Sequence, residues 1–469
     1  MKKRVISIIT VLILTLNSMT FIAFAQPDLN MEGNSTILLE TRLQQVIYKE
    51  NEETRRLPAS VTKIMTVAVA FDKIEEKEIP LETFTRISKK AASTSGARID
   101  LKEGELISLD SLLSAIIINS ANNASVALSE YFAGSEAEFV KLMNEKAAQM
   151  GLENTHFISC NGLTLSSDHY STAEDLSKIA LELIDEGDIF SYSSLKNKDI
   201  NIYRDGKTDA VIAEKARIAA ARKAQELAEK KAAEAARLAK AQKEAQAKAG
   251  AETQLPKVET PDKSKEAVKP EVQPEKLPEP IKPPAPKELG ILKTITLEST
   301  NKLLQVYDGV DGMKTGWMGP QSGYCFVGTA VRGDVRLLTV SLGAQAEGGN
   351  FRDTAKMLDY GFKDFRYIQL EEAGYKAGKL KVAGSFVSAK GILDEDLVLF
   401  GNLNEEDYRT EAVFEEMELP VEKGQKIGNL NVYAAEKLVY QTDIVSKNNV
   451  KKSVIISMME SIKGWFSKE

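Results

Sequence analysis

The strongest structural signal in the 469-residue chain is Pro58-Ala59-Ser60-Val61-Thr62-Lys63-Ile64-Met65-Thr66. Pro58 restricts the backbone before an apolar helical period over 60–74, so Ser60 is expected at or near a helix start. Residues i and i+3 share one helix face, which predicts the Lys63 amine beside the Ser60 hydroxyl. Serine needs an adjacent base to act as a nucleophile, and a lysine of lowered pKa can be that base. The stretch therefore predicts a Ser-Lys catalytic pair at a helix start.

A second motif, Ser120-Ala121-Asn122, follows the apolar run 115–118. It falls within a helical period over 109–133, and a further period covers 136–151. A serine hydroxyl can relay a proton, and the Asn122 amide can both donate and accept hydrogen bonds. Taken alone, the motif is better explained as a helix cap or a turn than as part of a catalytic site.

A third motif, Lys314-Thr315-Gly316, precedes extended apolar runs over 324–329 and 337–342. This pattern places it on or beside an edge strand. Gly316 permits close approach of a ligand to the backbone, and Lys314 presents a cation to a carboxylate. A second cation near Lys63 would also favour the neutral form of that amine.

The composition narrows the chemistry. The net charge is −7, from 61 basic and 68 acidic side chains, which gives no electrostatic reason to expect nucleic-acid binding. The only cysteines are Cys160 and Cys325, and the only histidines are His156 and His169. Two cysteines cannot build a four-thiolate zinc site, and two histidines leave little room for metal catalysis, so we expect no metal or other cofactor. The sequence leaves open whether the cysteines pair in an oxidising compartment or stay as buried thiols.

Both ends of the chain carry membrane-related segments. Lys2, Lys3 and Arg4 precede an apolar run over 5–16, and Ala23-Phe24-Ala25 has the small-x-small pattern of a signal-peptidase site. We expect a signal peptide over 1–25, with an uncleaved anchor as the alternative. Residues 450–469 predict an amphipathic membrane-anchor helix that holds a secreted chain on the outer face of the cytoplasmic membrane. The alternative is a terminal helix that packs on its own domain.

Composition also divides the interior of the chain. Residues 213–249 consist almost entirely of Ala, Lys, Arg, Glu and Gln, which predicts a long solvated helix, or one that contacts an anionic polymer. The following stretch is rich in proline and predicts an extended linker. Because motifs lie on both sides, we expect 205–289 to be an insertion in a domain over 26–366. Short alternating runs over 367–447 predict a small β-rich domain.

In this order, the three motifs resemble those of the penicillin-recognising serine enzymes. The longer strings 58–66, 119–125, 154–157, 161–163 and 309–316 are similar to those of the low-molecular-mass D-alanyl-D-alanine carboxypeptidases. The resemblance covers about 37–364 and continues into the β-rich domain and the tail. It implies an α+β fold: a β-lactamase/transpeptidase-like domain, with an antiparallel sheet flanked by helices, followed by a small β-sandwich domain and a terminal amphipathic helix.

The resemblance implies catalytic roles. Ser60 would form an acyl-enzyme with the penultimate D-Ala carbonyl of a peptidoglycan stem pentapeptide. Lys63 would be the general base, although the identity of the base is disputed among such enzymes. Ser120 would relay protons. The backbone N–H groups of Ser60 and Trp317 would form the oxyanion hole.

The resemblance also implies substrate-binding roles. Asn122 would orient the peptide, and Lys314, Thr315 and Gly316 would bind the terminal D-Ala. The partners would be bacterial muropeptides, with β-lactams as covalent inhibitors. His156 and His169 are expected to be structural, since a Ser-Lys site needs no imidazole.

Two other functions stay open. A β-lactamase would need a carboxylate that speeds deacylation, and no Glu motif between the second and third elements suggests one. A catalytically idle wall-binding or spacer protein would not be expected to retain all the motif residues. The sequence departs from the family pattern at Asn123, where Asp is common, and at Trp317, which could narrow the mouth of the site.

Overall fold

The computed structural model describes residues 27–186, 188–208, 288–404, 408–434, 436–456 and 458–459. The predicted signal peptide over 1–25, the Ala/Lys-rich stretch and the proline-rich stretch lie outside the described residues, as does most of the predicted terminal helix.

The helices and strands follow one another in a mixed order. The helical elements are η1 (Ala59–Thr62), α1 (Lys63–Glu76), α2 (Lys89–Ser93), α3 (Leu109–Ile117), α4 (Asn122–Ala133), α5 (Glu136–Gln149), α6 (Ala173–Glu186), α7 (Phe190–Ser193), α9 (Leu303–Val306) and α10 (Gly349–Asp364). The strands of the first part are β1 (Ser35–Glu40), β2 (Gln45–Glu50), β3 (Phe84–Arg86), β4 (Leu106–Ser108), β5 (Asn197–Thr208), β6 (Glu288–Glu298), β7 (Val310–Trp317), β8 (Tyr324–Arg332) and β9 (Val335–Ala344). The later strands are β10 (Phe365–Glu371), β11 (Lys376–Leu380), β12 (Ala389–Ile392), β13 (Leu397–Asn402), β14 (Tyr408–Phe414), β15 (Lys426–Ala434) and β16 (Lys437–Ser446).

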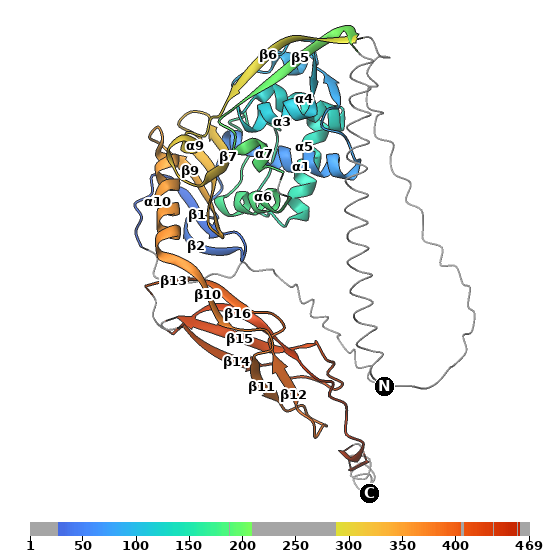
Figure 1. Ribbon diagram of the computed structural model, residues 1–469, viewed down its shortest axis with the longest axis vertical. Helices are drawn as coiled ribbons and strands as arrows, with labels where there is room; N and C mark the ends of the chain where they lie inside the picture. Colours follow the sequence, from blue (N-terminus) through green and yellow to red (C-terminus); the bar gives the residue numbers. More distant parts are fainter. Residues whose placement is uncertain are drawn as a thin grey trace, which may run out of the picture.

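An antiparallel sheet of order β2-β1-β9-β8-β7 lies in the upper part of the molecule in Figure 1, with α10 on one side and α1 and α6 on the other. Alternate residues of β1 face opposite sides: Ile37 and Leu39 join the core under the helices, and Leu38 joins the core on the α10 side. This is the antiparallel sheet flanked by helices that the resemblance implies. The third motif lies on β7, which is an edge strand, as expected.

The helical period predicted over 109–133 is wrong as a single helix. It is divided into α3 and α4 by residues 118–121, and Ser120 in this link has a positive φ of 62°. The apolar side chains on both sides are buried, so the pattern continues although the helix does not. Ser108 caps α3 by accepting from the N–H of Ser111, and α4 ends at Gly134 with a left-handed backbone.

A second sheet of order β3-β4-β5-β6 ends in the long β5–β6 hairpin. Residues 205–208 and 288–289, which the sequence places in the insertion, belong to these two strands, and Thr208 pairs with Glu288. Ion pairs from Lys293 on β6 to Asp100 (2.8 Å) and Glu105 (3.1 Å) connect the hairpin to the segment that follows α2.

The C-terminal strands form the β-sandwich that the resemblance implies, from sheets of order β10-β13 and β11-β12-β16-β15-β14. The core beneath α10 and the outer face of β1 and β2 continues into this sandwich. The Gln45 side chain accepts from the N–H of Phe400 (3.0 Å), and the Tyr367 hydroxyl donates to Glu40 (2.8 Å). These contacts join the sandwich to the central sheet.

The predicted terminal helix begins later than expected. Val450 is fully buried and pairs with Val421 as an isolated bridge, so it belongs to the sandwich. Residues 454–456 and 458–459 are helical. Across the part of the chain that the structure describes, no helix is both long and apolar enough to cross a membrane.

Candidate active site

Ser60 lies on the one-turn helix η1, and Lys63 is the first residue of α1. Ser60 is half-buried and Lys63 is fully buried. The Nζ atom of Lys63 lies 2.8 Å from Ser60 Oγ, as the three-residue spacing predicts. Gly162 packs directly against this turn, since an added Cβ at Gly162 would fall 1.9 Å from the carbonyl oxygen of Ala59.

Two further oxygen atoms surround the Lys63 amine. Nζ donates to Asn122 Oδ1 at 2.8 Å and to the backbone carbonyl of Asn161 at 2.9 Å. Burial, followed by the charge of Lys314, holds the pKa of Lys63 well below its ordinary value. The structure therefore brings Ser60, Lys63 and Asn122 together around an amine whose neutral form is favoured.

The second motif meets this pair from the link between α3 and α4. Asn122 is the first residue of α4; its Nδ2 donates to the carbonyl of Ser95 at 2.9 Å, and its backbone N–H donates to Ala97 at 2.7 Å. Its amide is thus oriented with Oδ1 toward Lys63. Ser120 is buried two residues earlier, in the left-handed conformation described above.

The third motif lines the other side, on β7. An added Cβ at Gly316 would lie 2.9 Å from the carbonyl oxygen of Pro58 and 3.2 Å from the N atom of Ser60, so β7 runs directly against η1. Lys314 is buried, and desolvation lowers its pKa to about 7. Its Nζ donates to the carbonyl of Thr315 at 3.0 Å.

Three supporting groups have no clear signal in the sequence. The carbonyl of Asn161 accepts from Lys63, and the hydroxyl of Thr300 lies 2.7 Å from that of Thr315. His169 is buried and joins two parts of the site: Ile158 N–H donates to its Nδ1 (3.1 Å), and its Nε2 lies 2.8 Å from Thr62 Oγ1. Since Nδ1 accepts, Nε2 carries the proton and donates to Thr62. Burial lowers the pKa of His169 to about 4, which keeps the ring neutral.

Trp317 ends β7 beside the site. Its side chain is 58% exposed and stacks on Tyr324, with ring centroids 5.8 Å apart. The indole therefore extends the site outward as an aromatic surface rather than filling the core.

Both cysteines are buried free thiols. Burial raises the pKa of Cys325 to about 12 and that of Cys160 further, so neither thiol is activated. The described residues hold no group of three His, Cys, Asp or Glu side chains arranged to bind a metal ion.

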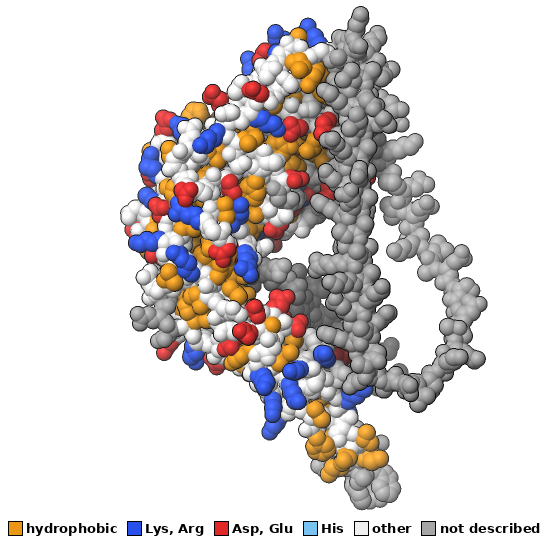
Figure 2. Space-filling model, viewed as in Figure 1, with side chains coloured by type: hydrophobic (Ala, Val, Ile, Leu, Met, Phe, Trp, Pro, Cys, Tyr) orange, Lys and Arg blue, Asp and Glu red, His pale blue; other side chains and the backbone are white. Residues whose placement is uncertain are grey.

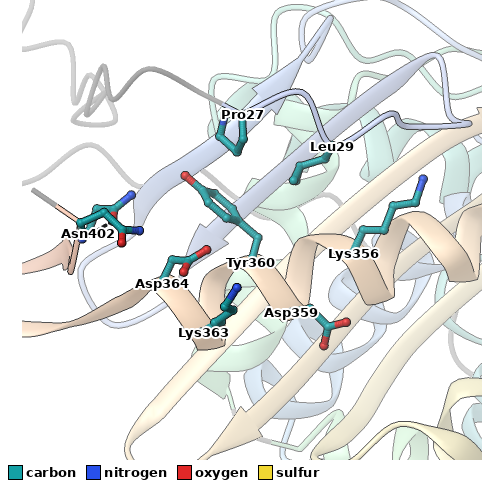
Figure 3. Close-up of a pocket in the computed structure, with 9 residues that line it drawn as sticks. Pro27, Leu29, Lys356, Asp359, Tyr360, Lys363, Asp364 and Asn402 are labelled. Atoms are coloured by element: carbon teal, nitrogen blue, oxygen red, sulfur yellow. Dashed lines mark hydrogen bonds between the residues drawn. The ribbon is translucent and has the colours of Figure 1, made fainter.

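A hollow of about 620 Å³ lies elsewhere, between the segment that begins at Pro27, the α10 helix and the end of β13 (Figure 3). Tyr360 and Asp364 of α10 and Asn402 line it. It contains none of the residues of the three motifs, so it is separate from the Ser60 site.

Comparison with known proteins matches this architecture in two segments. Residues 22–223 and 274–346 match the family model of D-alanyl-D-alanine carboxypeptidase, peptidase S11. Residues 365–452 match the model of the C-terminal domain of penicillin-binding protein 5.

Individual relatives agree with the family models. The D-alanyl-D-alanine carboxypeptidase DacF of Bacillus subtilis (strain 168) is 27% identical over 456 residues, which cover 95% of this chain and 94% of the relative. Penicillin-binding protein 5 from Haemophilus influenzae superposes with a TM-score of 0.64 at 21% identity, over 92% of this chain and 100% of that one. The carboxypeptidase DacD from Francisella tularensis gives a TM-score of 0.63 at 20% identity, over 91% and 95%.

The solved structures are too distant in sequence to establish more than the fold. The peptidase S11 model, however, covers more than half of the chain, in two segments, and includes all three motifs. The chain therefore belongs to the D-alanyl-D-alanine carboxypeptidase family of serine peptidases.

Proposed function

We propose that this carboxypeptidase removes the terminal D-alanine of peptidoglycan stem pentapeptides through an acyl-enzyme on Ser60, with Lys63 as the general base. One observation carries the proposal: the buried Lys63 amine lies 2.8 Å from Ser60 Oγ. Its environment favours the neutral form that a base requires.

A count of hydrogen bonds supports the same assignment. Asn122 Oδ1 and the Asn161 carbonyl oxygen can only accept. A neutral Lys63 amine has two N–H groups, which these two oxygens would use. Its lone pair would then be directed at the Ser60 hydroxyl, so that the hydroxyl donates to the amine. This is the arrangement that proton abstraction from Ser60 needs.

In the acylation step, Ser60 Oγ would attack the penultimate D-Ala carbonyl while its proton passes to Lys63. The backbone N–H groups of Ser60 and Trp317 would stabilise the oxyanion, since η1 and β7 lie against each other there. The C–N bond would then break, and the leaving D-Ala amine would take the proton from Lys63, with Ser120 as a relay. Water would hydrolyse the ester and restore Ser60.

Recognition of the substrate would come from the second and third motifs. Lys314 would offer a cation to the terminal carboxylate, and the Thr315 hydroxyl would donate to it, oriented by Thr300 at 2.7 Å. Gly316 would allow the peptide to approach the edge strand. Asn122 would orient the peptide while it holds Lys63. A β-lactam carries a carboxylate beside an acylating carbonyl, so the same groups would make it a covalent inhibitor.

We also propose where the chain works. The signal peptide over 1–25 would be removed. The domain over 26–366, interrupted by 205–289, would carry the chemistry, and the domain over 367–447 would connect it to an anchor helix at the C-terminus. That helix would hold the secreted enzyme peripherally on the outer face of the bacterial cytoplasmic membrane, facing its peptidoglycan substrate.

The test is covalent labelling of the mature chain (26–469) with a fluorescent penicillin. We expect label on the parent and none on Ser60→Ala, while Ser194→Ala, at an exposed serine directly after α7, labels like the parent. Release of D-Ala from a pentapeptide should follow the same pattern. Absence of label on a folded parent would overturn the proposal in favour of an idle wall-binding protein. Rapid turnover of the bound penicillin would favour a β-lactamase.

A further inference from the structure

The loop 381–388, which joins β11 to β12, exposes two large apolar side chains. Phe386 is 71% exposed and Val387 is 55% exposed. The loop lies at the far end of the sandwich from the central sheet, beside the C-terminal segment (Figure 1). Single exposed apolar residues are ordinary on protein surfaces, but adjacent ones at a loop tip indicate a contact surface when they continue into a larger patch.

The patch does continue, into the start of the C-terminal helical segment. The N–H of Ser453 donates to the carbonyl of Gly384 at 2.8 Å, so the segment leaves the sandwich directly beside the loop. The residues that follow are apolar and more than half exposed: Val454, Ile455, Met458 and Met459. Figure 2 shows hydrophobic side chains gathered at this tip, next to the C-terminus. Loop and helical segment thus form one apolar tip.

Lysines lie behind this apolar tip. Lys381 is the first residue of the loop and Lys390 lies on β12 just after it; the N–H of Lys447 donates to the carbonyl of Lys390 at 2.8 Å. Lys451 and Lys452 immediately precede the helical segment. The five lysines are exposed, and Figure 2 shows Lys and Arg side chains between the apolar tip and the rest of the molecule. The adjacent stretch 415–423 contributes four exposed carboxylates, Glu415, Glu416, Glu418 and Glu422, and a further exposed lysine, Lys423, so six lysines face four carboxylates and the rim is basic on balance.

An apolar tip with a basic rim matches the two layers of an anionic membrane surface. Apolar side chains enter the boundary between headgroups and acyl chains, and lysines remain at the level of the phosphates. A second copy of the chain would present the same positive charge and would repel this rim. The charge therefore favours anionic lipid as the occupant.

We propose that the loop 381–388 is a second membrane contact, which inserts Phe386 and Val387 into an anionic lipid bilayer beside the C-terminal helix. The inference rests on the membrane attachment proposed above and deepens it. If the helix were the only membrane contact, the sandwich could adopt many angles to the membrane surface. Contact at both the helix and the loop would fix the angle of the sandwich, and with it the direction in which the Ser60 site faces.

The test is co-sedimentation of the mature chain (26–469) with vesicles of phosphatidylglycerol and phosphatidylcholine, or of phosphatidylcholine alone. The loop variant is Phe386→Ser/Val387→Ser, and the helix variant is Ile455→Ser/Met459→Ser. The matched control is Ile291→Ser/Val306→Ser, which changes two residues that are 60% and 78% exposed but lie outside the sandwich. Penicillin labelling of every variant shows whether the catalytic part is intact.

We expect the loop variant to bind anionic vesicles about tenfold or more weakly than the parent. The control should bind like the parent, and binding should weaken in phosphatidylcholine alone and in high salt. If the loop variant binds like the parent while the helix variant is released, the loop proposal is wrong and the helix attachment stands. If the parent binds neither vesicle, both are wrong. If the parent is a dimer without lipid and the loop variant is a monomer, the tip is instead a contact between two copies of the chain. Labelling by penicillin separates all of these results from a failure of the catalytic proposal.

Discussion

Lys63 Nζ lies 2.8 Å from Ser60 Oγ, and the other two contacts of the amine, Asn122 Oδ1 and the Asn161 carbonyl, are acceptors only. The amine comes from the first residue of α1, the amide from the first residue of α4, and the carbonyl from the loop after α5. Three separate segments therefore hold the Lys63 amine in place beside the Ser60 hydroxyl.

Replacement of Lys63 by methionine keeps the length of the side chain but removes the base. We expect Lys63→Met to lower the second-order rate of acylation by a fluorescent penicillin by about 10² to 10⁴-fold, the usual contribution of general-base catalysis. The fold should persist, because an apolar side chain replaces a desolvated amine. Circular dichroism checks the fold. Acylation at the parental rate would contradict the assignment of Lys63 as the general base.

The pH dependence of kcat/KM should be bell-shaped. Acylation needs neutral Lys63, so the rate should rise with pH through the lowered pKa of that amine. Binding of the carboxylate needs charged Lys314, whose pKa is about 7 in the free enzyme, so kcat/KM should fall as pH rises above that value. Assays on a pentapeptide from pH 5 to pH 10 measure both limbs.

Arginine at position 314 separates the two limbs. A guanidinium stays charged throughout this range, so Lys314→Arg should abolish the alkaline limb, whatever its effect on KM. An unchanged alkaline limb in this variant would assign that limb to another group.

Sequence reasoning reached the parts of the site that are encoded locally. Ser60 and Lys63 are three residues apart on one helical face, and the apolar runs over 324–329 and 337–342 after Lys314 predict the strands that the structure shows as β8 and β9. The supporting contacts are different in kind. The Asn161 carbonyl is a backbone atom that any residue would provide, and His169 reaches Thr62 across 107 positions of the chain.

The residues at which helices begin and end also could not be predicted from the apolar pattern. The apolar period continues through 118–121, although the helix stops there, because tertiary burial rather than helix geometry accounts for Ile118. The positive φ of Ser120 could not be predicted, because glycine is the residue that usually marks such a position and none is present here. Val450 fits the apolar face of the predicted terminal helix, but in the structure it is buried and pairs with Val421, so it is part of the sandwich.

Gly162 should tolerate no side chain. An alanine there would need a positive φ of 76° and would place its Cβ 1.9 Å from the carbonyl oxygen of Ala59, beside the nucleophile. We expect Gly162→Ala to destabilise the protein by about 2–4 kcal/mol and to slow acylation further by moving η1. Gly151→Ala is the matched control, since Gly151 has a φ of 67° with open space around it. Urea unfolding compares the two, and equal losses would show that only the backbone conformation matters.

His169 should make the protein sensitive to acid. Its pKa is about 4 in the folded state, against about 6.5 in an unfolded chain, because burial disfavours the charged ring. Between about pH 4 and pH 6.5, His169 therefore binds a proton in the unfolded state but not in the folded state. The associated stability is complete above pH 6.5 and is lost as pH falls toward 4, with a total of about 3 kcal/mol.

Glutamine at position 169 tests this contribution, because its amide can donate to Thr62 and accept from Ile158 without titrating. Other groups also titrate in this range, so the informative quantity is the difference between variant and parent. We expect urea unfolding at pH 7 and pH 4.5 to show a smaller loss of stability for His169→Gln than for the parent. His156→Gln, at an exposed histidine, should behave like the parent. A loss for His169→Gln as large as that of the parent would mean that the ring is already protonated in the fold, and the hydrogen bond from Ile158 to Nδ1 would then be wrong.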